Sequence, residues 1–386
     1  MKLDDIVYYG HDGRFHRGRI EAEKGRFMKV TDEGEAGGTG EGLFAIPGMI
    51  DLHLHGAAGC DVCDATQDAL RKIAEYEAVN GVCAMAPATM TLPVPELEKI
   101  LANAADFRDA QLSLDPGEGA FMADLAGINM EGPFISQKRK GAQNGEYIIS
   151  INTETAKRLI EAGRGIVKFL GIAPEENPGF EDFIREMKGE VHISLAHTDT
   201  DYDTALQAFK AGADHVVHMF NAMAPFLHRS PGLIGAAASM AGLDIEIICD
   251  GIHVHPAAVR AAFNMMKDNH MILISDSMRA AGLPDGVYTL GGTRVKVTGK
   301  RAAMLSDPSV LAGSVSNLHD MLRTAVLEAG IPVADAVRAV TENPAKSLGI
   351  YADLGSIEEG KKADIVILDK NLEIRGVMKD GVWIRE

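Results

Sequence analysis

Residues 47–56, PGMIDLHLHG, form a short apolar run that ends in two histidines and a glycine. Short apolar runs bounded by glycine and proline are typical of buried strands. Side chains two positions apart on a strand project to the same side, so His53 and His55 should point together at its carboxyl end. Two neighbouring imidazoles suit a borderline metal such as zinc or iron. Because His-x-His also occurs by chance, this pair alone leaves open a polar strand end with solvated histidines.

The same pattern, an apolar run that ends in one Glu, His or Asp, recurs downstream. These runs end in Glu131, His197, His218 and Asp276. A buried strand end gains nothing from an unpaired polar group, so several such ends imply a common partner. We therefore predict that these side chains and the histidine pair converge on a divalent metal site; the alternative is a set of unrelated capping and loop residues.

Around these runs, short apolar segments alternate with amphipathic ones, as in VHISLAHTD followed by YDTALQAFKAGA. Strands that alternate with helices of 10–15 residues indicate parallel βαβ units. About 300 residues of such units fit a (β/α)8 barrel better than a doubly wound open sheet. Both chain ends instead read as short strands between glycine turns. We expect a barrel over residues 48–350 beside a small β-sandwich domain formed by residues 1–47 and 351–386.

The composition excludes several classes of function. The chain has 386 residues, and 38 Lys and Arg against 55 Asp and Glu give a formal net charge of −17. This balance disfavours nonspecific binding to nucleic acid or to anionic membranes, and an anionic substrate would need a locally placed cation. No signal peptide and no run of roughly 18 apolar residues is evident, so we expect a cytoplasmic protein without membrane association. Cys60 and Cys63 have the spacing of a zinc or redox pair, but no second pair accompanies them, and we interpret them as free thiols.

Longer motifs carry a family resemblance. PGMIDLHLHG, NMEGPF, LAHTD, HMFNAM and the tail GSIEEGKKADIVILD resemble the amidohydrolase superfamily, in order and over nearly the whole chain. NMEGPFISQKRKGAQN, HMFNAMAPFLHRSPGLIGAA, CDGIHV and LAGSVSNL narrow the resemblance to deacetylases of amino-sugar phosphates. This resemblance implies hydrolysis of N-acetylglucosamine 6-phosphate to glucosamine 6-phosphate and acetate. It leaves open the galactosamine epimer, a cyclic amidase or nucleobase deaminase, and a metal-bearing binding module without catalysis.

The resemblance also implies roles for the strand-end residues. Glu131, His197 and His218 match the principal metal site of the superfamily. The histidine pair at 53 and 55 matches a second site, with Glu131 bridging the two metals. Asp276 matches the catalytic aspartate, which touches the first metal and carries the proton. We therefore expect two divalent ions, zinc or iron, with manganese and cobalt as alternatives.

Substrate contacts follow from the same resemblance. His253 matches the histidine that contacts the acetyl carbonyl, and Arg229 matches a residue that binds the sugar phosphate. His255 lies on the same strand face but precedes a proline, so we interpret it as a loop residue or subunit contact. The resemblance also suggests a homodimer. The other implied substrate contacts lie in three short segments: Ala142 and Gln143; Asn221 and Ala222; and Leu311, Ala312 and Gly313.

Overall fold

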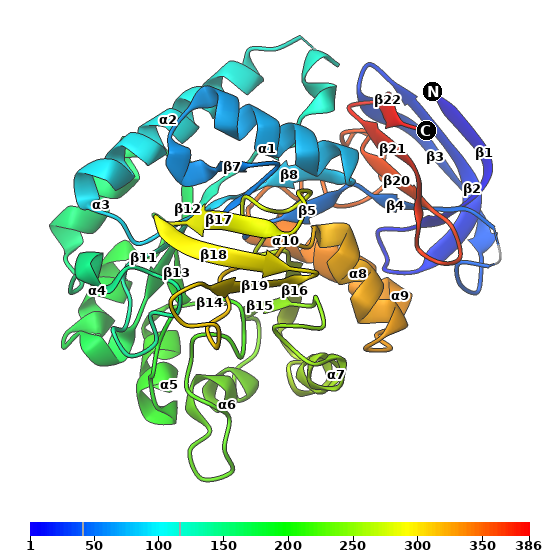
Figure 1. Cartoon of the computed structure of the whole chain (residues 1–386). Coiled ribbons are helices and arrows are strands. Elements are labelled where there is room, and N and C mark those ends of the chain that lie inside the picture. Colours follow the sequence, from blue (N-terminus) through cyan, green and yellow to red (C-terminus); the bar gives the residue numbers. More distant parts are fainter. Residues whose placement is uncertain (41, 116) are drawn as a thin grey trace.

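The computed structural model describes residues 1–40, 42–115 and 117–386, and its centre consists of two parallel sheets surrounded by helices (Figure 1). Nearly every central strand residue is buried, which explains why these strands read as continuous apolar runs. The larger sheet is curled and contains, in spatial order, β16 (His270–Ile274), β15 (Asp244–Ile248), β14 (His215–Val216), β13 (His192–Leu195), β12 (Val167–Ile172), β11 (Ile128–Phe134) and β9 (Ala88–Thr89). The smaller contains β10 (Asp124–Leu125), β8 (Val82–Met85) and β5 (Met49–Asp51).

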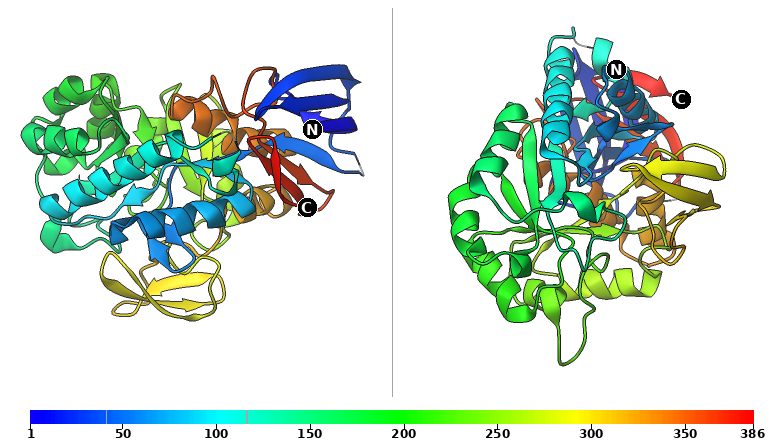
Figure 2. Two further views of the ribbon diagram at one scale, coloured as in Figure 1. Left: turned by 90° about the horizontal axis from the view of Figure 1, so that it is seen from above. Right: turned by 60° about the vertical axis from the view of Figure 1, so that its left-hand side comes forward.

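Helices alternate with these strands along the chain and lie outside them (Figures 1 and 2). The predicted succession of parallel βα units is therefore confirmed. No described helix has the length and apolar character needed to cross a membrane. The helices are α1 (Gln67–Val79), α2 (Val94–Leu112), α3 (Thr153–Ala162), α4 (Phe180–Met187), α5 (Tyr202–Ala211), α6 (Gly232–Ala238), α7 (Pro256–Met265), α8 (Leu318–Leu327), α9 (Val333–Val340) and α10 (Glu342–Ser347).

The two ends of the chain join one further sheet, here called the terminal sheet, at the edge of the molecule (Figure 1). Its centre is the antiparallel pairing of β4 with β20, which connects the N-terminal strands to the C-terminal ones. The domain boundaries and a sandwich of two facing sheets stay predictions. In spatial order its strands are β22 (Val382–Arg385), β21 (Ile374–Lys379), β20 (Ile365–Leu368), β4 (Phe44–Pro47), β1 (Lys2–Tyr9), β2 (Phe15–Glu23) and β3 (Arg26–Glu35).

Two small antiparallel sheets were not foreseen from the sequence. The first, β17 (Gly286–Leu290), β18 (Thr293–Thr298) and β19 (Arg301–Met304), stands apart from the ring of helices in Figure 2, where it is yellow. Its strands alternate between buried and exposed positions, as expected for a sheet that is covered on one face. The second pairs β6 (Gly56–Ala57) with β7 (Cys60–Asp61).

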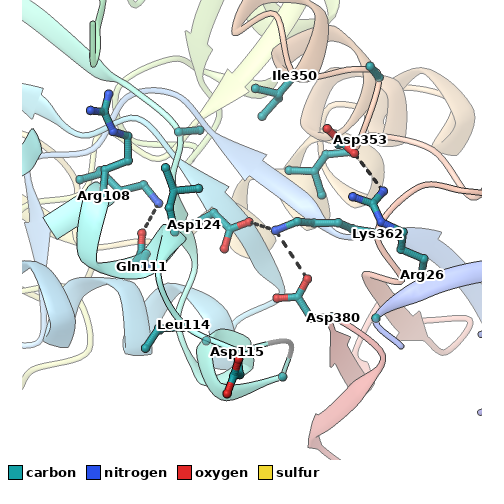
Figure 3. A pocket seen from close by; sticks show the side chains of 18 of the residues that line it. Arg26, Arg108, Gln111, Leu114, Asp115, Asp124, Ile350, Asp353, Lys362 and Asp380 are labelled. Atoms are coloured by element: carbon teal, nitrogen blue, oxygen red, sulfur yellow. Dashed lines mark hydrogen bonds and ion pairs between the residues drawn. The ribbon is translucent and has the colours of Figure 1, made fainter. Parts of the chain in front are cut away.

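A cluster of oppositely charged side chains joins the terminal sheet to the smaller parallel sheet (Figure 3). Asp124 of β10 accepts hydrogen bonds from Lys362 at 2.6 Å and from Lys379 of β21 at 2.7 Å. Lys379 also donates to Asp380 at 2.8 Å and is only 1% exposed. Burial raises the pKa of Asp124, but Lys379 and Lys362 outweigh burial and hold that pKa below its ordinary value. Asp124, Lys362 and Asp380 line a cavity of about 530 Å³ at this junction.

Replacing Lys379 with methionine should lower the free energy of unfolding by about 3 kcal/mol, because Asp124 loses a buried partner. Chemical denaturation at neutral pH measures this change. Because folding lowers the pKa of Asp124, the contribution of the cluster is present above the unfolded carboxyl pKa of about 3.9. It should be lost as the pH falls from there through the lower, folded-state pKa.

The matched control is Lys157→Met, which removes the exposed ion pair of Lys157 with Glu186 at 2.6 Å. This variant should unfold almost like the unmodified chain, because exposed ion pairs contribute little. Equal destabilisation by the two substitutions would show that the buried cluster around Asp124 contributes no more to the free energy of unfolding than an exposed ion pair.

Candidate active site

Six buried side chains converge at the carboxyl ends of the parallel strands. They follow β5, β13, β14 and β16 in the chain, except for the glutamate, which lies within β11. They form two groups, and within each group one ligand atom from every residue lies within 4.8 Å of the others. One group is the expected principal set, Glu131, His197 and His218, and the other is His53, His55 and Asp276. The structure thus groups Asp276 with the histidine pair and not with the principal set, whose metal the resemblance implied that it touches. The structure therefore brings together all six residues that the sequence predicted as metal ligands.

Glu131 contacts both groups. One of its carboxylate oxygens lies 2.7 Å from Nε2 of both His197 and His218, and the other lies 3.4 Å from Nε2 of His55. Burial raises the pKa of Glu131, but the neighbouring histidines, His197 foremost, outweigh burial and hold the pKa well below its ordinary value. Glu131 is thus placed as an ionised carboxylate between the two groups.

Three of these six residues have a left-handed backbone, with φ of 44° at His197, 29° at His218 and 46° at Asp276. Residues other than glycine rarely adopt such angles, and each costs of order 1–3 kcal/mol. All three stand just after a strand ends, where the backbone turns its side chain toward the other ligands. Such strain persists only where the surrounding structure enforces it, and it marks this edge as a functional site.

The donor atoms fit a divalent metal. Nδ1 of His55 lies 3.0 Å from the carbonyl of Ala88, and Nδ1 of His197 lies 2.9 Å from that of Arg139. A carbonyl can only accept, so each Nδ1 carries the proton, and in the neutral ring Nε2 keeps a lone pair. Nε2 of His53 is buried and has no hydrogen-bond partner within the described part of the chain. Four imidazoles with two carboxylates are ligands that zinc, iron and manganese accept.

A cavity of about 360 Å³ opens beside the two groups. Of the predicted substrate contacts, seven line it and two do not. Ala312 is fully buried and donates its backbone N–H to Ala302 of β19 at 3.2 Å. Arg229 is exposed on the loop that precedes α6 and is not among the described lining residues, so its predicted contact with phosphate stays a prediction. The predicted residues that line the cavity are Ala142, Gln143, Asn221, Ala222, His253, Leu311 and Gly313.

Gln143 is fixed by two hydrogen bonds at the border of the cavity. Its amide nitrogen donates to Glu131 at 2.6 Å, and its amide oxygen accepts from the backbone of Thr91 at 2.7 Å. These bonds hold the side chain against the shared carboxylate. Gln143 therefore restrains Glu131 as well as lining the space beside it.

Two charged residues were not predicted from the sequence: Arg139, which lines the cavity, and Asp250, which contacts the cavity residue His253. Arg139 is the single Lys or Arg among the described lining residues, and its Nε donates to Asp199 at 2.6 Å. Asp250 lies 2.7 Å from Nδ1 of His253 and accepts its backbone N–H at 2.8 Å. Burial lowers the pKa of His253, but Asp250 outweighs burial and raises it. The motif CDGIHV contains this pair three residues apart, so the spacing was a usable signal.

Two other sequence interpretations concern neighbouring residues. His255 is exposed, and its Nδ1 accepts a hydrogen bond from the backbone of Ala257 at 3.1 Å, which caps the start of α7. It is thus a loop residue, as expected. Cys60 and Cys63 form no disulfide in the described structure, and their interpretation as free thiols that bind no metal stays a prediction. The backbone N–H of Met90, a cavity residue, donates to the sulfur of Cys63 at 3.4 Å.

Known proteins resemble this chain over most of its length. The profile of the amidohydrolase family matches residues 44–384. An N-acetylglucosamine-6-phosphate deacetylase of Bacillus subtilis (strain 168) is 41% identical to this chain, over 85% of the length of this chain and 81% of the length of the relative. An N-acetylgalactosamine-6-phosphate deacetylase of Escherichia coli O157:H7 is 35% identical over 87% of this chain and 86% of its own. A mutant N-acetyl-D-glucosamine-6-phosphate deacetylase from Mycobacterium smegmatis, solved with N-acetyl-D-glucosamine-6-phosphate, has a TM-score of 0.90 at 28% identity and covers 100% of this chain and 99% of its own.

Proposed function

Because the chain belongs to the amidohydrolase family, we propose that it hydrolyses N-acetylglucosamine 6-phosphate to glucosamine 6-phosphate and acetate. The observation that carries this proposal is Glu131, which joins two groups of metal-type ligands at the wall of one cavity. The volume of about 360 Å³ lies in the range of small-molecule sites. The relative named for the glucosamine substrate is more similar in sequence than the one named for galactosamine, which favours the former.

The two groups are proposed to hold one divalent ion each, with Glu131 bridging them. Zinc and iron fit these ligands, and manganese and cobalt are alternatives. When bound, the ions would supply a water molecule that is a strong nucleophile at neutral pH. The convergence of six ligand residues and the unpartnered Nε2 of His53 support this assignment.

Asp276 and His253 are proposed to take different parts in the hydrolysis of the amide, one in proton transfer and the other in stabilising the acetyl oxygen. Asp276 lines the cavity, so its carboxylate could take a proton from the attacking water and return it to the leaving amine. His253 has its Nδ1–H directed at Asp250, which leaves Nε2–H of the protonated ring to donate to the acetyl oxygen as negative charge develops. The raised pKa of His253 favours that protonated ring.

Arg139 is proposed as the cation that meets the phosphate. Its guanidinium is partly buried at the cavity wall and can form a bidentate pair with phosphate oxygens. Asp199 holds it on one side, and Lys138 pairs with the same carboxylate from outside the described cavity lining. Arg229 remains the contact implied by the family motif, from a loop that is exposed in this chain.

The two parallel sheets are proposed to form one (β/α)8 barrel together with the helices around them. The backbone N–H of Asp276, just after β16, donates to the carbonyl of His53, just after β5, at 2.9 Å. This bond brings the edge of the larger sheet to the smaller one. The terminal sheet supports a small domain built from residues 1–47 and 351–386. A homodimer is proposed on the family resemblance alone.

Acetate release across a panel of N-acetyl amino-sugar phosphates tests the proposed reaction. We expect release from N-acetylglucosamine 6-phosphate, at a higher kcat/KM than from the galactosamine epimer or the unphosphorylated sugar. Asp276→Asn should lower kcat by about 100- to 10,000-fold, because it removes the proton carrier. Because Asp276 also belongs to a candidate metal group, metal content is measured by mass spectrometry on the same samples, and the rates are compared at a metal concentration that gives both proteins the same content.

Two outcomes would contradict these assignments. No acetate from any member of the panel would redirect the search to cyclic amides and nucleobases. Turnover by Asp276→Asn at the rate of the unmodified protein would remove Asp276 from the chemistry.

Arg139→Ala should lower kcat/KM for the phosphorylated sugar by about 10- to 100-fold, since a hydrogen-bonded charge pair is lost. The unphosphorylated sugar should be affected far less. The control is Lys138→Ala, which removes an adjacent cation that pairs with the same Asp199 but is absent from the described cavity lining. The kcat/KM values of Arg229→Ala are measured with the same two sugars. A loss seen only with Arg229→Ala would move the phosphate contact to the exposed loop.

A further inference from the structure

Glu246 is a fully buried glutamate beneath the two candidate metal groups. It lies in the middle of β15, among isoleucines, and its side chain reaches the centre of the parallel sheets. Its Oε2 lies 2.8 Å from Nδ1 of His53, and its Oε1 accepts a hydrogen bond from the amide of Asn129 at 3.1 Å. Its Oε2 also accepts the backbone N–H of His218 at 3.2 Å. Nε2 of His215, which belongs to neither metal group, lies 3.0 Å from the same Oε1, so this buried carboxylate is paired on several sides, as the burial of a charge requires.

The contact with His53 decides which nitrogen of that ring can bind a metal. A carboxylate accepts, so Nδ1 of His53 carries the proton and donates to Glu246. Nε2 is then left with its lone pair in the neutral ring. Nε2 faces the shared site, 3.8 Å from carboxylate oxygens of both Glu131 and Asp276. Glu246 thus holds His53 in the tautomer and orientation that a metal requires.

The other candidate ligands are held differently. Nδ1 of His55 and Nδ1 of His197 face neutral backbone carbonyls, at 3.0 Å and 2.9 Å. Nδ1 of His218 has no hydrogen-bond partner among the described residues. Among the described residues, His53 is therefore the one of these four histidines whose Nδ1, the nitrogen that points away from the shared site, faces a carboxylate. A carboxylate behind a histidine raises its basicity and strengthens its bond to a metal.

We propose that Glu246 is a positioning residue that sets the metal affinity of the His53, His55 and Asp276 group. This role rests on the metal assignment proposed above. Within the described part of the chain, Glu246 contacts the other group only through the backbone N–H of His218, so its replacement should weaken the two groups unequally. The residue determines whether the chain holds one divalent ion or two at a given free metal concentration.

Zinc binding to the metal-free full chain tests this role. Glu246→Gln keeps the size of the side chain but removes its charge. We expect zinc affinity at one of the two sites, the His53, His55 and Asp276 group, to fall by about 10- to 100-fold while the other site keeps its affinity. At a free zinc concentration that saturates the unmodified chain, Glu246→Gln should retain one zinc ion where the unmodified chain holds two. Mass spectrometry after equilibrium dialysis gives the count.

Glu77→Gln is the matched control, because Glu77 of α1 is also fully buried, its carboxylate has no hydrogen-bond partner in the described structure, and it belongs to neither metal group. It should keep two zinc ions. Two zinc ions with unchanged affinity in Glu246→Gln, or an equal weakening of both sites, would overturn the proposal. No zinc on the unmodified chain would overturn the metal assignment together with it, whereas a failure to release acetate would leave the zinc result standing.

A second measurement does not depend on the folding of any Glu246 variant. In the unmodified metal-free protein, nitrogen-15 spectra of histidine rings report which nitrogen carries the proton. His53, assigned by the signal lost in His53→Asn, should carry it on Nδ1. A proton on Nε2 alone would overturn the proposed orientation.

Discussion

The candidate site depends on one buried charge, the carboxylate of Glu131. It is 3% exposed, and taking such a group out of water costs several kcal/mol unless it is paired. Its pairing comes from imidazoles that follow three different strands, His55, His197 and His218. The strands must therefore end at the same level for this carboxylate to stay ionised. The parallel architecture brings these three histidines to one carboxylate, and their pairing with it offsets the cost of burying a ligand shared by two groups.

A second constraint follows from the close packing below the site. The strands are apolar and almost wholly buried up to their last residues, so they have no room to adjust there. The change of direction is concentrated in single residues with left-handed backbone, His197, His218 and Asp276. Rigid strands below these turns keep the strained angles in place. The packing that stabilises the lower part of the sheets thus also fixes the positions of the candidate ligands at their upper edge.

Local patterns predicted much of this arrangement, and long-range contacts account for what they missed. The strand-end rule found His53 and Glu131 because each closes an apolar run, a feature visible in a few neighbouring residues. Glu246 lies inside an apolar strand, and its partner His53 is 193 positions away, so no local pattern connects them. Arg139 was hidden among adjacent basic residues in QKRK, where spacing does not say which side chain turns inward. The strands of residues 286–304 were not predicted, because they form an antiparallel insertion that interrupts the βα alternation.

The negative charge of the chain connects metal binding with binding of the substrate. The whole molecule carries −17, yet the proposed substrate is an anion. At the cavity wall, Glu131 and Asp276 contribute −2, while Arg139 and the protonated His253 contribute +2, so the protein alone leaves no net local charge. Two divalent ions would add +4 and make the wall positive. Fixed charges in a cleft act over its whole width, so the ions that prepare the water also draw the phosphate in. Metal occupancy and phosphate recognition are then coupled by electrostatics, although different residues carry them out.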